Sequence, residues 1–220
     1  MKYLFTLGLL ASCLQAGPIT YPVYNTPVES GDMTGTRSVG SGGLADGGGT
    51  DYDNLTLDWN IALVDQTYEY TYTIGGFSTH DLGHLILDLS GAAPISDAEV
   101  NGDPATLFFG DWCAADSPCQ GASNIGLPND IQGLKIDPLP SGSPVVVTFT
   151  STQAPVWGDF YVMGGTEYVY NIGNEDHNDS LALDFVARPD PAVAPEPATF
   201  GLAGAALLAL GLMRRKHRQS

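Results

Sequence analysis

Two neighbouring stretches in the first half of the chain alternate apolar and polar residues with a period of two. Residues 55–64 read LTLDWNIALV, and residues 68–74 read YEYTYTI. A period of two is typical of a strand that buries one face. The link between them, Asp65-Gln66-Thr67, is too short for a parallel crossover. The sequence therefore predicts an antiparallel hairpin that places these side chains in the core: Trp59, Ile61, Leu63, Tyr70 and Tyr72.

Further short runs rich in β-branched and aromatic residues indicate seven more strands. They cover residues 85–89, 106–109, 134–136, 145–150, 160–163, 168–172 and 181–186. No amphipathic helical pattern separates them, and 27 Gly and 15 Pro favour a loop-rich β fold. We expect an all-β fold: a single β-sandwich of jelly-roll or immunoglobulin-like type over residues 55–187. Residues 17–54 are expected to form a Gly-rich arm and loop, and residues 188–194 an extended linker.

Residues 1–16 have the pattern of a secretory signal peptide. Lys2 supplies the positive charge, Tyr3 to Leu10 form the apolar core, and cleavage after Ala16 would leave Gly17 as the new first residue. The run Leu10-Ala11-Ser12-Cys13 also matches a lipobox, which would make Cys13 a lipidated N-terminus. Simple cleavage is favoured because the apolar core is short for a lipoprotein.

The charge distribution excludes polyanionic partners. The formal net charge is −17, and Arg37, Lys135 and Arg188 are the body's three cationic side chains apart from histidine. Such an acidic body repels nucleic acid and anionic lipid, and it favours solubility in a crowded surrounding.

Removal of Cys13 with the signal would leave two cysteines, Cys113 and Cys119, in a short polar loop. An even number of cysteines in an exported chain indicates a disulfide. The loop that it closes is small, so the expected stabilisation is about 2–3 kcal/mol.

Residues 195–220 are made of three parts in a fixed order. Pro195, Glu196 and Pro197 form a stiff, extended tripeptide. Residues 198–213 carry no charge and, as a membrane-spanning helix, would be roughly 24 Å long, against about 30 Å of hydrocarbon. The basic residues of the tail 214–220 should stay on the cytoplasmic side. They are Arg214, Arg215, Lys216 and Arg218.

This order of tripeptide, short apolar helix and basic end resembles the PEP-CTERM sorting signal of Gram-negative bacteria. The resemblance implies recognition by an exosortase, a membrane-embedded cysteine protease-transpeptidase that cuts near Pro195-Glu196-Pro197. The protein would be held transiently in the inner membrane and then released to the cell surface or the exopolysaccharide matrix. An ordinary C-terminal membrane anchor is the alternative interpretation of the same stretch.

Other candidate sites rest on weaker patterns. Two acidic loops could supply several oxygen ligands to calcium, although neither has EF-hand spacing. Their candidate ligands are Asp51, Asp53, Glu175, Asp176 and Asp179. His80 and His84 are four residues apart, but Gly83 and the strand that follows speak against a helical zinc site. No other metal or cofactor is expected.

We expect a non-enzymatic surface or matrix protein, because no Gly-x-Ser-x-Gly elbow and no triad spacing is evident. Two alternatives stay open. One is a carbohydrate-binding module that holds exopolysaccharide through Trp112, Trp157 and exposed Tyr residues, and the other is a secreted hydrolase.

Overall fold

The computed structural model describes residues 24–40, 42–77, 81–89, 94–114, 124–175 and 184–190. Within these ranges the fold is all-β, with two single-turn 3-10 helices, η1 (Ser30–Asp32) and η2 (Ile172–Asn174). The described strands are β1 (Thr34–Val39), β2 (Gly43–Gly47), β3 (Thr56–Val64), β4 (Thr67–Gly75), β5 (His84–Asp88), β6 (Ile95–Val100), β7 (Asp103–Pro104), β8 (Leu107–Trp112), β9 (Ile131–Ile136), β10 (Val145–Ser151), β11 (Pro155–Gly158), β12 (Phe160–Gly164), β13 (Glu167–Asn171) and β14 (Val186–Pro189). The expectation of an all-β fold is confirmed.

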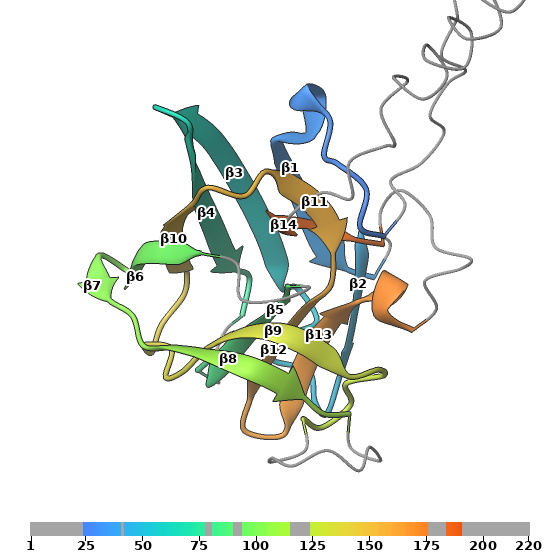
Figure 1. The fold of residues 1–220 in the computed structure, drawn as a ribbon. Coiled ribbons are helices and arrows are strands. Elements are labelled where there is room, and N and C mark those ends of the chain that lie inside the picture. Colours follow the sequence, from blue (N-terminus) through green and yellow to red (C-terminus); the bar gives the residue numbers. More distant parts are fainter. Residues whose placement is uncertain are drawn as a thin grey trace, which may run out of the picture.

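The strands form one large curled sheet and one small sheet, rather than the two similar sheets of the predicted sandwich. The large sheet has twelve strands in the order β7-β6-β10-β4-β3-β1-β2-β13-β12-β5-β9-β8, and the small one pairs β11 with β14. Figure 1 shows the large sheet bending so that its two halves face each other, with β11 and β14 beside them. A sheet of this width accumulates twist and curls, so one face can bury itself.

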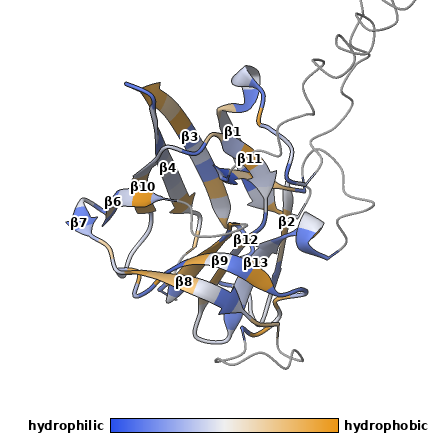
Figure 2. Ribbon diagram, viewed as in Figure 1, coloured by the Kyte–Doolittle hydropathy of each residue, from blue (hydrophilic) through white to orange (hydrophobic). Residues whose placement is uncertain are grey.

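The predicted hairpin is confirmed as β3 and β4, which pair antiparallel with Trp59 opposite Tyr72. Asp65 and Gln66 link them with φ angles of 48° and 72°, the left-handed pair that a two-residue type I′ turn requires. Figure 2 shows hydrophobic and hydrophilic residues alternating along β3. The prediction for Leu63 is wrong, because its side chain is 63% exposed. Strand β1 pairs with β3 only as far as Asn60, so Leu63 lies beyond the neighbouring strand.

The main core fills the concave side of the curled sheet and includes residues from β3, β4, β5, β9, β10, β12 and the β11–β14 pair. Stacked aromatic rings form part of it, with the ring centroids of Tyr70 and Phe149 5.3 Å apart. A second, smaller cluster lies on the opposite face and contains Ile86, Leu127, Ile131 and Tyr161. Strands β5 and β12 contribute to both clusters, which explains why the successive residues Leu85, Ile86 and Leu87 of β5 are all buried.

The segment before residue 55 is not the irregular arm that its glycines suggested. Its described part contains β1 and β2, which join the large sheet between β3 and β13. Glycine permits close packing here: an added Cβ at Gly35 would overlap the Trp59 ring, and one at Gly47 would overlap the Tyr168 ring. The glycines therefore let the backbone lie directly on aromatic rings.

The predicted boundary between the domain and an extended linker at residue 188 is also wrong. Strand β14 runs from Val186 to Pro189, and Arg188 is completely buried. Of the predicted strand 181–186, only residues 184–186 are described, and of these only Val186 lies in β14. In the described part of the chain, no helix has the length and apolar character needed to span a bilayer. The predicted helix 198–213 lies outside the described residues, as do the signal peptide and residues 191–220.

Candidate functional site

Strand β14 is the last described strand, and it is buried along its whole length. Phe185, Val186, Ala187 and Arg188 each have 0% of their surface exposed. The strand pairs antiparallel with β11, with Val156 opposite Arg188 and Gly158 opposite Val186. On the other side of β11 runs the N-terminal segment, because the N–H of Asn25 donates to the carbonyl of Trp157 at 2.8 Å. The two ends of the described chain therefore lie against the same strand.

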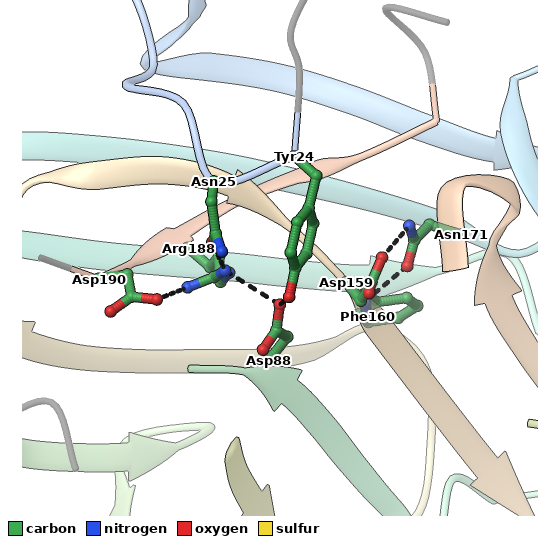
Figure 3. Close-up of polar contacts among 8 residues, drawn as sticks. All are labelled: Tyr24, Asn25, Asp88, Asp159, Phe160, Asn171, Arg188 and Asp190. Carbon is green, nitrogen blue, oxygen red and sulfur yellow. Dashed lines mark hydrogen bonds and ion pairs between the residues drawn. The ribbon is translucent and has the colours of Figure 1, made fainter. Parts of the chain in front are cut away.

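Arg188 is held by polar groups from three parts of the chain, shown in Figure 3. Its Nη2 forms an ion pair with Asp88 of β5 at 2.9 Å and donates to Oδ1 of Asn25. Its Nη1 contacts Asp190. The hydroxyl of Tyr24 donates to Asp88 at 2.7 Å, and the guanidinium lies 5.7 Å from the Tyr24 ring centroid. We call these five residues, Tyr24, Asn25, Asp88, Arg188 and Asp190, the Arg188 clamp.

Gly158 leaves the space that the guanidinium occupies. An added Cβ at this position would overlap Nε of Arg188. Among the described residues, Nε has no hydrogen-bond partner. The contact with the Gly158 backbone, together with the clamp, fixes the position of the guanidinium.

A second buried polar group adjoins the clamp. The Asn171 side chain of β13 donates to Oδ1 of Asp159 at 2.9 Å and accepts from the N–H of Phe160 at 2.6 Å. It also donates to the carbonyl of Asp184 at 2.6 Å, just before β14. Figure 3 shows this group beside Asp88, whose N–H donates to the carbonyl of Asp159 at 3.0 Å. The network ties β13, β5 and the approach to β14 together.

The clamp concentrates charge in the protein interior. Asp88 and Asp190, which are 4% and 2% exposed, pair with one buried guanidinium. Asp159, which is 2% exposed, adds a third carboxyl group near Asp88. Burial lowers the pKa of Arg188, but Asp88 and Asp190 outweigh this effect, so its pKa is raised and the group stays charged. Burial raises the pKa of Asp88, and the positive charge of Arg188 opposes this shift. Burial and the nearby Asp88 also raise the pKa of Tyr24, which keeps its hydroxyl as a donor.

Arg37 is a second buried arginine, and it is held differently. Its guanidinium lies 4.7 Å from the ring centroid of Trp59 and 5.7 Å from that of Trp157. The two indoles meet edge to face, with centroids 5.9 Å apart. Its Nε donates to the carbonyl of Phe185 at 2.9 Å, directly before β14. Burial lowers the pKa of Arg37 to about 10, although Asp184 and Asp32 act in the opposite direction.

The two tryptophans of the sugar-binding alternative both lie on strands. Trp157 lies on β11 and is only 4% exposed, so it is a core residue and the sugar-binding alternative has no support from this side chain. Trp112 is half-buried on β8, where its indole N–H donates to the carbonyl of Gly133 at 3.0 Å. The Lys135 ammonium lies 5.4 Å from the Trp112 ring centroid and pairs with Asp137 at 2.9 Å. Phe108 and Phe109, which the sequence reasoning did not single out, are each 46% exposed on the same strand.

The calcium candidates are not assembled into a site by the described residues. The N–H of Asp51 donates to the Glu167 carboxylate at 2.9 Å, while Glu175 accepts from the Tyr170 hydroxyl at 2.6 Å. The candidate Asp53 shares a hydrogen bond with Asp46, and burial together with this neighbouring carboxyl raises the pKa of Asp46. The described part of the chain contains no group of three or more side chains able to hold a metal ion. Asp176 and Asp179 lie outside it.

His84 is a buried strand residue. Its Nε2 lies 3.2 Å from Oδ1 of Asn124, and burial together with the nearby Lys135 lowers its pKa to about 4. It is therefore neutral at neutral pH, and His80 lies outside the described residues. Cys113 is 2% exposed at the end of β8. Its pairing with Cys119, also outside the described residues, stays a prediction.

Sequence reasoning missed the Arg188 clamp because Pro189 and Pro191 suggested an extended linker. The one sequence feature that could have indicated the clamp was the scarcity of positively charged residues in the body. Each of the three body cations has a specific partner: Arg188 has carboxylates, Arg37 has indoles, and Lys135 has Asp137 and Trp112. In so acidic a chain, a single arginine next to a terminal segment is a candidate for a buried ion pair.

Comparison with known proteins identifies the region that follows β14. Residues 193–216 match the PEP-CTERM protein-sorting motif. No curated protein and no solved structure matches the chain. This motif indicates an exported protein sorted to the cell surface, and it implies recognition by an exosortase. The chain therefore carries a PEP-CTERM protein-sorting motif that begins three residues after the buried Asp190.

Proposed function

We propose that the protein is a non-enzymatic component of the cell surface or exopolysaccharide matrix of a Gram-negative bacterium. An exosortase cleaves it near Pro195-Glu196-Pro197 after the helix at 198–213 has held it transiently in the inner membrane. The observation that carries this proposal is the match of residues 193–216 to the sorting motif. The body is the part that remains after processing.

The buried ion pairs of Arg188 support a structural role for the body. Arg188 is fully buried, and its charge is directed at Asp88 and Asp190 inside the protein. A group closed off from solvent in this way holds strands together and has no access to a substrate. Burial of Trp157 likewise removes one of the two tryptophans that the sugar-binding alternative named.

Glu196→Ala tests the proposed function. Prolines alone give the tripeptide its extended shape, so the carboxylate of Glu196 should supply the recognition charge. We expect the variant to cross the inner membrane normally and to accumulate as a membrane-bound form that keeps its tail. Fractionation and a C-terminal epitope tag would follow both forms.

The matched control is Glu99→Ala, which removes an exposed carboxylate from β6. It should be released like the wild type. Release of the Glu196→Ala variant without its tail at the wild-type rate would refute the proposed recognition. Retention of the tail by the wild type in a strain with an active exosortase would favour an ordinary membrane anchor.

A further inference from the structure

The chain leaves the folded body from a buried position. Asp190, the last described residue, is 2% exposed, and its N–H donates to the carbonyl of Ala154 at 3.3 Å. The sorting motif begins at residue 193, and its tripeptide begins at Pro195. Only residues 191–194 therefore separate a buried residue from the tripeptide.

Covalent geometry limits how far the tripeptide can lie from the body. From Asp190 to Pro197 the chain advances seven residues. Even when fully extended, these residues span at most about 25 Å. While β14 stays in place, a protease that acts at the tripeptide must therefore work within about 25 Å of Asp190. This limit holds for any conformation of residues 191–197.

Several side chains hold β14 in place in addition to its pairing with β11. The hydroxyl of Tyr72 donates to the carbonyl of Ala187 at 2.7 Å, and Arg37 donates to the carbonyl of Phe185 at 2.9 Å. The Arg188 clamp then connects the end of the strand to β5 and to the N-terminal segment at Asn25. Release of β14 would leave buried carboxylates such as Asp88 without their cation, which is energetically costly.

We propose that the Arg188 clamp keeps β14 seated while the exosortase acts, so that the length of the 191–194 linker determines whether the protease can reach its site. This inference rests on the proposed function. It implies that the folded body lies next to the membrane-embedded protease during cleavage. Arg188 acts as a positioning residue in this step. It sets the point from which the sorting motif starts, without contacting the protease.

A series of linker lengths tests the inference in the full chain. Deletion of residues 191–194 should block loss of the C-terminal tail, because the folded body would obstruct the protease. Replacement of the same residues by Gly-Ser-Gly-Ser keeps the length and controls for the loss of motif residues Val193 and Ala194. This replacement, and a variant with an additional Gly-Ser-Gly-Ser insertion, should be processed like the wild type.

Arg188→Met provides a readout that a purely structural residue would not give. Combined with the deletion, it should restore loss of the tail, because β14 can then leave the body and lengthen the accessible segment. With the natural linker it should leave the processed fraction unchanged. The processed fraction would be measured with a C-terminal epitope, and the melting temperature would report whether each body is folded.

The outcomes separate this inference from the proposed function. If the deletion variant has a wild-type melting temperature and still loses its tail at the wild-type rate, the inference is wrong while the proposed function stands. If the Gly-Ser-Gly-Ser replacement also fails to be processed, sequence rather than length limits cleavage, and the inference is again wrong. If the wild type keeps its tail in the presence of an active exosortase, the proposed function itself fails.

Discussion

Arg188 and Arg37 are both buried, yet the protein accommodates their charges in opposite ways. Arg188 faces the carboxylates of Asp88 and Asp190, while Arg37 lies over the faces of Trp59 and Trp157. The net pKa shifts have opposite directions: the pKa of Arg188 is raised, because its carboxylates outweigh burial, and that of Arg37 is lowered by burial to about 10. Carboxylates compensate for the loss of water around a guanidinium, whereas burial outweighs what the surroundings of Arg37 provide.

The difference determines what remains after each arginine is removed. At the Arg188 clamp, carboxylates would be left in the interior without their cation. At the Arg37 site, the neutral indoles would be left, together with carbonyl acceptors such as that of Phe185. The carboxylates that favour the Arg37 cation, Asp184 and Asp32, are partly buried and exposed, so water can still solvate them. Arg37 holds the residue directly before β14, and the clamp holds Arg188 near the end of the strand. Substitutions at the two arginines therefore show which contact secures β14.

Arg188→Met should have the largest effect. The substitution keeps much of the side-chain volume but leaves Asp88 and Asp190 buried without their partner. Breaking a buried ion pair on one side costs about 3–5 kcal/mol. Denaturant unfolding of the body would measure the change in the free energy of unfolding. A loss below that of Arg37→Met would contradict the distinction between the two sites.

Gly158→Ala tests how rigidly the Arg188 guanidinium is held. The new Cβ would overlap Nε of Arg188, and the guanidinium cannot move away without breaking the contacts of its Nη2 with Asp88 and Asn25. We expect a loss of about 1–3 kcal/mol from this overpacking. Gly110→Ala is the matched control, because its Cβ would meet only a Trp112 carbon, 3.9 Å away. Equal melting temperatures of the two variants would show that the guanidinium can adjust its position.

Arg37→Met should cost less than Arg188→Met. The variant loses its cation–π contacts, which are worth about 0.5–2 kcal/mol, and its hydrogen bonds to the carbonyls of Phe185 and Thr36. Methionine can still pack against the indoles of Trp59 and Trp157. We expect a total loss of about 1–3 kcal/mol in the same unfolding assay. A Trp fluorescence change without loss of stability would show that the cation is dispensable there.

The parts of this architecture that sequence could predict are those set by local periodicity. The β3–β4 hairpin was predictable because apolar and polar side chains alternate along most of both strands, and the β12–β13 hairpin because glycines separate two apolar runs. The sorting motif was predictable because it is a contiguous pattern that does not depend on the fold.

The parts that sequence could not predict depend on contacts between distant residues. Arg188 lies 163 positions from Asn25, and a local pattern contains no information about that hydrogen bond. The glycines of β1 and β2 resembled a flexible segment because the aromatic rings they pack against, such as Trp59 and Tyr168, belong to other strands. The single curled sheet also arises from pairings such as β2 with β13, which bring together residues far apart in the chain.

Asp88→Asn should have the smallest effect on the free energy of unfolding. The direction in which this effect changes with pH is informative. The amide removes one negative charge from a site with three carboxyl groups and one guanidinium, and its oxygen can still accept from Tyr24. We expect a loss of about 1 kcal/mol near neutral pH, well below that of Arg188→Met. Asp88→Asn should cost less than Arg188→Met because the native state tolerates a neutral group at position 88, as the raised pKa of Asp88 indicates.

The pH dependence of that variant completes the comparison. Because the pKa of Asp88 is raised in the folded protein, the native state binds this proton more tightly than the unfolded chain does. The stabilisation that comes from this tighter proton binding is fully present below the ordinary pKa of about 3.8. It is lost as the pH rises through the pKa that Asp88 has in the folded protein. The stability of the wild type relative to Asp88→Asn should therefore fall as the pH is raised from this range. A relative stability that instead rises with pH would show that the attraction of Arg188 outweighs burial at Asp88. Arg188 would then lower the pKa of its partner, and the clamp would be a net favourable ion pair.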